Sequence, residues 1–137
     1  MKTLVIYYSY SGHTQAIAKE LAAKEAANLA EIKDTKRPGM LKAYTVGCIA
    51  AIRGKAWPIQ PMDADMAGYD RLMLLAPIWA GNPAPAFNAM LAMLPKGKSI
   101  AVTMVSGSGK SDCKERLDAL IKSKGCTLES FEDIKAL

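Results

Sequence analysis

The sequence has little of several residue types on which catalytic and metal sites depend. It contains one histidine, His13, and three cysteines that share no close spacing: Cys48, Cys113 and Cys126. An odd number of scattered cysteines indicates reduced, mostly buried thiols and makes a zinc or iron–sulfur site improbable. No pair of carboxylates and no Ser/His/Asp arrangement stands out either. We therefore assign no catalytic residue and no metal ligand.

Long hydrophobic runs are also absent. No stretch approaches the ~20 apolar residues that span a bilayer. The opening run is too short for the core of a signal peptide and has no cleavage pattern behind it. Half of the 137 residues are apolar, which suits one globular domain covering residues 1–137. We expect a cytoplasmic protein with no membrane span.

Acidic residues are scarce in one segment, residues 33–55. It holds six basic side chains against Asp34 alone, and so carries the whole net charge of +5. This segment is interpreted either as a solvated helix face or as a docking site for an acidic partner or another polyanion. Tyr44 is the one aromatic residue close to these charges, so nucleic-acid binding is not favoured. The basic residues are Lys33, Lys36, Arg37, Lys42, Arg53 and Lys55.

Apolar runs alternate with helical patterns along the chain. Such alternation predicts an α/β fold in which helices cover both faces of a parallel sheet. The last predicted helix carries Leu117, Leu120 and Ile121 and ends before Gly125. The predicted strands cover 3–8, 29–34, 71–76, 99–105 and 127–131, and the other predicted helices cover 13–27, 41–52 and 87–94.

The most informative segment lies at the start of the chain. The apolar run Leu4–Tyr8 predicts a buried central strand, and an alanine-rich helical pattern follows Thr14. Between them lie two serines and Gly12. The first N–H groups of a helix have no partner inside it, and the helix dipole favours an anion there. Hydroxyl groups and a glycine that admits close backbone approach add to this, so the segment predicts a phosphate site.

Three segments together resemble the flavin loops of flavodoxin-like proteins. The first, Y-S-x-S-G-H-T after the first strand, resembles their FMN-phosphate loop. Residues 76–83 follow the third strand and 106–109 the fourth, where that family places its other flavin loops. The resemblance covers essentially the whole chain. It implies bound FMN, held by Ser9, Tyr10, Ser11, Gly12, His13, Thr14, Pro77, Ile78, Trp79, Ala80, Gly81, Asn82, Ser106, Gly107, Ser108 and Gly109.

The resemblance implies a flavodoxin-like three-layer fold with a parallel five-stranded sheet in the order 2-1-3-4-5. Ligands of such sheets bind beyond the carboxyl ends of the strands, where the strand order reverses. Strands one and three flank that point. The loops that begin at Ser9 and Pro77 should meet there, which supports the assignment independently.

Individual residues leave alternatives open. Trp79 is expected to stack on the flavin ring, or else to cover the sheet end as a hydrophobic lid. His13 should contribute its backbone N–H rather than its ring. Residues 106–111 resemble a nucleotide-binding loop, but Met104 stands where that motif needs its first glycine. These residues are interpreted as a flavin loop, or as a simple turn.

Only six residues follow Phe131 in this sequence, whereas most flavodoxins have a full helix at that point. We therefore expect a short form without that helix. Part of one sheet face would then be bare, or covered by a loop, a tail or another subunit. A homodimer that buries the region around Phe131 and Leu137 is one such arrangement.

Three functions fit these observations. The leading interpretation is an FMN-binding electron-transfer protein, whose flavin supplies the redox chemistry. Its partner would be a redox protein or a quinone-like acceptor. The alternatives are an NAD(P)H-dependent flavin or quinone reductase, and a non-redox interaction module on the same fold.

Overall fold

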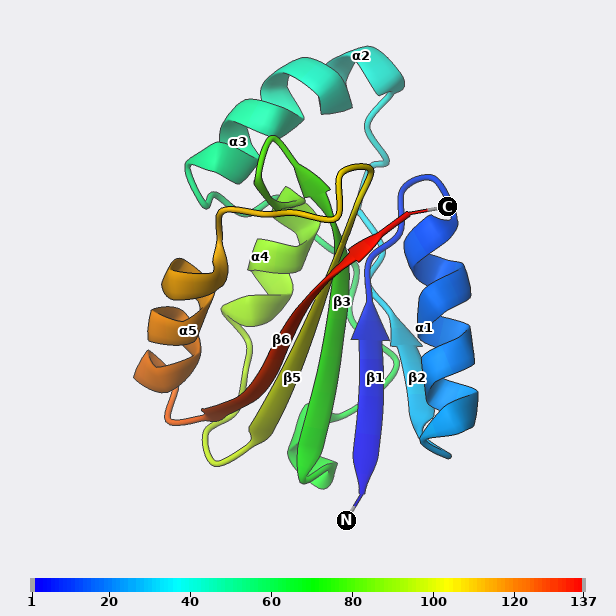
Figure 1. The fold of residues 1–137 in the computed structure, drawn as a ribbon, viewed down its shortest axis with the longest axis vertical. Helices are drawn as coiled ribbons and strands as arrows, with labels where there is room; N and C mark the ends of the chain where they lie inside the picture. Colours follow the sequence, from blue (N-terminus) through cyan, green and yellow to red (C-terminus); the bar gives the residue numbers. More distant parts are fainter. Residues whose placement is uncertain (1, 137) are drawn as a thin grey trace.

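The computed structural model describes residues 2–136 and shows helices packed around one central sheet (Figure 1). The strand order is β2-β1-β3-β5-β6, and the short β4 (Asn82–Pro83) pairs antiparallel with β3. Counted in chain order, the five parallel strands follow the predicted order 2-1-3-4-5. They are β1 (Thr3–Tyr7), β2 (Asn28–Glu31), β3 (Arg71–Trp79), β5 (Ser99–Ser106) and β6 (Thr127–Lys135).

The helices lie on both faces of the sheet and across one of its ends. Figure 1 shows α1 on one side, α4 and α5 on the other, and α2 and α3 across the carboxyl ends of the strands. The helices are α1 (His13–Lys24), α2 (Met40–Lys42), the π-helical η1 (Ala43–Gly47), α3 (Cys48–Ile52), the 3₁₀ turn η2 (Met66–Gly68), α4 (Pro85–Leu91) and α5 (Lys114–Ser123). Because α2, η1 and α3 are continuous, we call them the 40–52 helix.

The central strand β1 explains why the chain needs cover on both faces. Leu4 and Ile6 point to the α4–α5 side, and Val5 points to the α1 side; all three are fully buried. On the α1 side, small residues such as Ala18 let the helix approach the sheet closely. A strand that is apolar on both faces is typical of a parallel sheet between helix layers.

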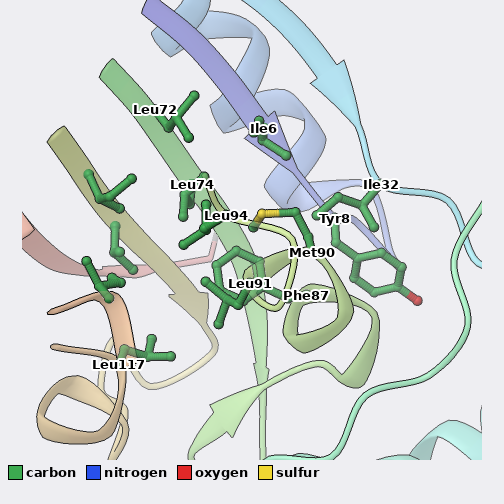
Figure 2. Close-up of a cluster of buried hydrophobic side chains, with 14 of the residues drawn as sticks. Ile6, Tyr8, Ile32, Leu72, Leu74, Phe87, Met90, Leu91, Leu94 and Leu117 are labelled. Carbon is green, nitrogen blue, oxygen red and sulfur yellow. The ribbon is translucent and has the colours of Figure 1, made fainter. Parts of the chain in front are cut away.

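The larger core lies between the sheet and α4. Figure 2 shows Phe87, Met90 and Leu91 of α4 against Leu72 and Leu74 of β3. Pro85 stands in the first turn of α4, where its missing N–H leaves no hydrogen bond unmade. The apolar spacing along α4 therefore forms the buried face that the sequence predicts.

Some element boundaries differ from the sequence predictions. β3 continues to Trp79 rather than ending at Ala76, because Pro77 still lies opposite Val105 of β5. β6 continues to Lys135, well past the predicted end at Phe131. Pairing with a neighbouring strand extends both elements beyond what local composition indicates.

The end of the chain forms sheet rather than a tail. A register shift in the pairing of β5 with β6, between Ile100 and Ala101, changes the alternation of β6. Phe131 consequently packs against the chain's own α4–α5 core, while Ile134 and α1 residues such as Ile17 border a cavity of about 250 Å³. Leu137 lies outside the described residues, so the expected homodimer stays a prediction.

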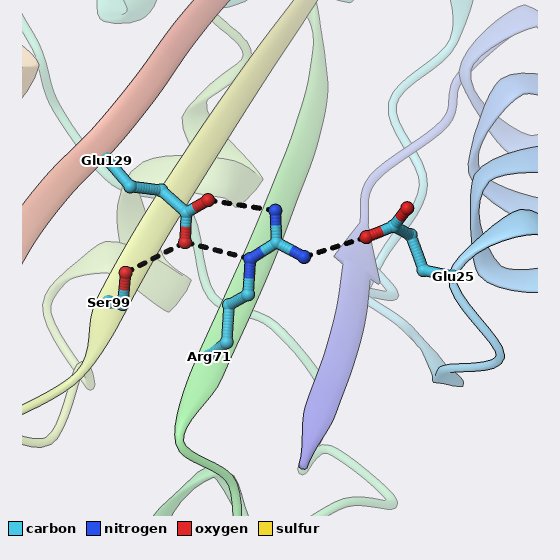
Figure 3. A network of polar contacts seen from close by, with 4 residues as sticks. All are labelled: Glu25, Arg71, Ser99 and Glu129. Carbon is cyan, nitrogen blue, oxygen red and sulfur yellow. Dashed lines mark hydrogen bonds and ion pairs between the residues drawn. The ribbon is translucent and has the colours of Figure 1, made fainter. Parts of the chain in front are cut away.

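A charged network joins three strands and α1 at the opposite end of the sheet (Figure 3). The Arg71 guanidinium donates from Nε and Nη2 to the two oxygens of Glu129, each at 2.8 Å, and from Nη1 to Glu25 at 2.8 Å. Ser99 Oγ donates to Glu129 at 2.7 Å. These hydrogen bonds, Arg71 first, hold the pKa of Glu129 below its ordinary value of 4.5.

This network predicts a pH-dependent contribution to stability. A lowered carboxyl pKa stabilises the fold above pH 4.5, and that stability is lost as the pH falls through the lowered pKa. Glu129→Gln should lower the free energy of unfolding by about 1 kcal/mol at neutral pH and flatten its fall in acid. Urea unfolding across the pH range measures both. Glu132→Gln, on the same strand, is the control; an equal effect there would contradict the assignment.

Candidate functional site

The candidate site lies at the carboxyl ends of β1 and β3. These strands pair in parallel, with Tyr7 opposite Leu75, and the Tyr8 N–H continues the ladder to the Leu75 carbonyl at 3.1 Å. β1 leads into the first predicted loop and β3 into the second. The strand order reverses between them, which is where open parallel sheets bind ligands.

The first loop ends in an exposed helix N-terminus. Gly12 has φ 101°, a left-handed conformation that glycine adopts without strain, and it precedes α1. The first helical hydrogen bond runs from the Ala16 N–H to the Gly12 carbonyl at 3.1 Å. The N–H groups of His13, Thr14 and Gln15 therefore have no acceptor within the helix and are available to an anion.

The hydroxyl groups of this loop differ in their surroundings. Ser9 Oγ accepts the Gly12 N–H at 3.1 Å, which shapes the loop and leaves the Ser9 O–H free to donate. Ser11 is exposed, with its Oγ 3.2 Å from His13 Nδ1. Thr14 is 2% exposed. Of the three predicted hydroxyl residues, Ser9 and Ser11 are the more exposed.

Arg37 lies against the first loop, although sequence reasoning placed it only in the basic segment. Its guanidinium carbon is 4.3 Å from the centre of the Tyr10 ring, and Nη2 donates to the Tyr10 carbonyl. Tyr10 in turn donates its O–H to the Pro38 carbonyl at 2.9 Å. A cation is thus fixed beside the predicted phosphate loop. Its position in the sequence could have identified it, because Arg37 follows closely after the second strand and that strand pairs with the first.

Asp34 is a second site residue that sequence reasoning missed. Tyr8 donates its O–H to Asp34 Oδ2 at 2.6 Å, while Asp34 Oδ1 is buried without a hydrogen-bond partner in the described chain. Burial raises the pKa of Asp34, and Tyr8 and Arg37 oppose that rise. Asp34 borders a cavity of about 220 Å³ that also contacts Ser9 and Arg37. The buried acceptor fits a ligand that brings a hydroxyl donor.

The second predicted loop is largely strand and hairpin. Pro77, Ile78 and Trp79 belong to the end of β3, and Trp79 lies opposite Asn82 of β4. Ala80 and Gly81 form the turn between them, with φ 53° and 85°. Two positive φ angles are what a tight two-residue hairpin requires. The hairpin fixes the direction of the Trp79 side chain.

Trp79 is the centre of an aromatic cluster. Its ring makes edge-to-face contacts with Tyr8, Tyr10 and Trp57 at centroid distances of 6.3, 5.6 and 6.2 Å. The 40–52 helix covers the cluster, and a cavity of about 170 Å³ lies between them. The sequence predicts flavin contacts for Trp79 and Tyr10, but it does not predict that the 40–52 helix covers them. The cavity is bordered by Tyr10, Met40, Ala43, Tyr44, Cys48 and Trp79.

The third predicted loop is held by hydrogen bonds among its own and adjacent residues. Ser106 Oγ accepts the N–H groups of Gly109 and Lys110 at 2.9 and 3.1 Å. None of the three cavities described above is bordered by residues 106–109, including Gly107 and Ser108. The connection to the second loop comes from Asp112, whose N–H donates to the Gly81 carbonyl at 2.7 Å. The first two loops therefore meet directly, and the third reaches the second only beyond its predicted residues.

Residues 2–136 contain no group of three or more His, Cys, Asp or Glu side chains placed to hold a metal ion. Within the same residues, no helix has both the length and the apolar character needed to cross a membrane.

Similar solved structures share this architecture. A flavoprotein from Lactobacillus acidophilus NCFM, crystallised in complex with FMN, matches with a TM-score of 0.75 and 22% identity, over 95% of this chain and 91% of that one. The oxidised flavodoxin 2 of Bacillus cereus matches with a TM-score of 0.60 and 19% identity, over 99% and 85%. The fold is flavodoxin-like.

A candidate flavoprotein from Bacteroides eggerthii DSM 20697 has the same fold, with a TM-score of 0.81 at 19% identity, over 96% of this chain and 86% of that one. No family model matches the sequence. In this flavodoxin-like fold, the arrangement offers backbone donors for an anion, a buried acceptor for a hydroxyl and an aromatic wall. These features suit, respectively, a phosphate, a hydroxyl group and a flat ring.

Gly47 sets how closely the 40–52 helix approaches the aromatic cluster. A Cβ at this position would lie 2.8 Å from Trp79 Cζ3 and 3.1 Å from Trp57 Cη2. Gly47→Ala should lower the free energy of unfolding by about 1 kcal/mol, because crowding outweighs the ~1 kcal/mol that alanine contributes to a helix. It should also change the intrinsic fluorescence, since both tryptophans of the chain lie in this cluster.

Gly39→Ala is the matched control, because an added Cβ there meets nothing within 4 Å. Chemical unfolding and emission spectra of the two variants provide the comparison. A Gly47→Ala protein that is more stable, with an unchanged spectrum, would show that the helix does not rest on the indoles.

Proposed function

We propose that this protein binds FMN at the carboxyl ends of β1 and β3 and acts as an electron carrier. The observation that carries the proposal is the N-terminus of α1: its first three N–H groups have no acceptor within the helix, and it follows β1, one of the two strands between which the strand order reverses. The FMN complex of the Lactobacillus flavoprotein, which has the same fold, supports it.

The phosphate would bind at the first loop. The N–H groups of His13, Thr14 and Gln15, together with the Ser9 and Ser11 hydroxyls, supply its donors, and Arg37 supplies a nearby positive charge. Each charge-assisted hydrogen bond of this kind contributes about 1.5–3 kcal/mol. These donors select a flavin that carries a phosphate.

The ribityl chain and the ring have separate places. Ribityl hydroxyls would donate to Asp34 Oδ1, which is buried without a partner among residues 2–136. Asp34 and Ser9 border the same cavity. The ring would contact the wall formed by Tyr10 and Trp79, below Tyr44 of the 40–52 helix. Bound FMN supplies the redox chemistry, and the chain contributes position and surroundings.

An electron carrier fits these residues better than a reductase. The site described here holds no carboxylate pair, and His13, the chain's one histidine, is exposed in the phosphate loop. The partner would be a redox protein or a quinone-like acceptor. The contacts of the site hold and orient a cofactor, and none of them is arranged to move a proton to a second substrate.

The phosphate contacts predict selectivity for FMN. FMN should bind at least about a hundredfold more tightly than riboflavin, a difference of roughly 2.7 kcal/mol. Ser9→Ala should remove much of that difference, and Ser130→Ala on the exposed side of β6 should remove none. Fluorescence titrations with both flavins measure the affinities. Equal affinities for FMN and riboflavin would rule out the phosphate assignment, and NADPH turnover by the FMN-loaded protein alone would identify a reductase instead.

The ring contact is tested at Trp79. Trp79→Ala should weaken FMN binding by about 1–2 kcal/mol, the scale of aromatic contacts beyond area burial. Trp57→Ala is the matched control, because Trp57 belongs to the same cluster but does not border the cavity below Tyr44. FMN titrations and melting curves separate the two roles. If Trp79→Ala lowers the melting temperature but keeps the FMN affinity, Trp79 is a packing residue.

A further inference from the structure

The 40–52 helix buries its small residues and exposes its large apolar ones. Its buried side consists of small residues, Ala43, Gly47, Ala50 and Ala51. Its large apolar residues point to solvent: Met40, Leu41 and Tyr44 are each 79% exposed, and Val46, Ile49 and Ile52 are more than half exposed. A surface helix ordinarily turns its large apolar side chains inward. Several large apolar side chains exposed on one helix are typical of an interaction surface.

The outward orientation is fixed by packing. The helix rests on Trp79 and Trp57, and even a methyl group at Gly47 would come within 2.8 Å of the indole of Trp79. Large side chains cannot replace the small ones on that side. The chain must therefore present its aliphatic residues on the outer side of the helix.

Basic side chains flank this apolar surface. Lys36 and Lys42 lie before and within the helix, and Arg53 and Lys55 follow it; all four are exposed. Asp34 is the one acidic residue in segment 33–55. The surface therefore combines aliphatic side chains with surrounding positive charge and suits a partner that is both anionic and apolar. Like charges disfavour a second copy of the same surface.

The surface has few directional polar groups. Tyr44 carries an exposed O–H, and Thr45 is exposed but its Oγ1 donates to the Leu41 carbonyl at 2.8 Å. Figure 1 shows the helix as a ridge along the outer edge of the molecule, with no other element beyond it. A protein partner is usually selected by shaped pockets and hydrogen bonds, whereas a bilayer requires only apolar side chains and positive charge.

We propose that the 40–52 helix binds the surface of an anionic lipid bilayer. The aliphatic residues enter the headgroup region, and the flanking lysines and arginines attract the anionic lipids. Met40 and Tyr44 belong both to this surface and to the cavity beside Trp79, so that cavity opens at the bilayer. One consequence rests on the proposed function: with reduced FMN bound, the acceptor class is a lipid-soluble quinone, which would take two electrons and two protons from the reduced flavin to become the quinol.

The test is co-flotation of the whole chain with vesicles. It should bind vesicles of equal parts phosphatidylcholine and phosphatidylglycerol, bind pure phosphatidylcholine far more weakly, and lose affinity as salt rises. Ile49→Gln should lower the partition coefficient about tenfold. Met93→Gln is the matched control, since Met93 is 52% exposed against 53% for Ile49 but lies outside this surface.

Charge is tested by a second matched pair. Arg53→Glu should weaken vesicle binding at least about fivefold, and Lys19→Glu, the same charge change on α1, should leave it nearly unchanged. Absence of binding to anionic vesicles, or equal effects of test and control variants, would overturn the proposal. So would a dimer in sedimentation that Ile49→Gln dissociates, or an acidic protein that binds this surface while vesicles do not.

The vesicle assay is run with and without added FMN. Binding that persists in both supports the surface proposal even if the flavin titrations fail. Loss of vesicle binding together with tight FMN binding overturns the surface proposal alone. The proposal of FMN binding and the proposal of bilayer binding can therefore be rejected independently of each other.

Discussion

The parallel pairing of β1 with β3 is the constraint on which the rest of this structure depends. It aligns the carboxyl ends of two strands that are more than sixty residues apart in the sequence. One end leads into the N-terminus of α1, and the other into the hairpin that carries Trp79. Backbone donors and an aromatic wall, which are useful to a ligand only together, meet because the two buried strands are neighbours.

The 40–52 helix adds a third part to the site formed at the ends of β1 and β3. It lies across the carboxyl ends of the strands (Figure 1), where it covers Tyr10 and Trp79. Its close approach depends on small residues, Gly47 above all. The same packing turns the large apolar residues outward. One set of contacts thus shapes the candidate site and creates the surface for which we propose a bilayer partner.

Several features could be predicted from the sequence because their signals are local. The apolar run at β1, the glycine before α1 and the apolar spacing of α4 each specify an element over a few residues. Trp79 could be identified because it stands in a restrained segment directly after a buried strand. Asp34 and Asp112 could not, because their roles depend on contacts with Tyr8 and Gly81 that are distant in sequence.

The sequence by itself determined the alternation of strands and helices, because hydrophobic periodicity and turn residues act over short distances. Its resemblance to flavodoxin-like proteins implied the order of the parallel sheet, which the structure has. Only the tertiary structure decided which side of the 40–52 helix faces water. It also decided that Asp34 Oδ1 is buried without a partner in the described chain, and that β6 continues to Lys135. These three features depend on contacts between segments that are distant in the sequence. Such contacts form only when the helices and strands, which local preferences favour, pack against one another.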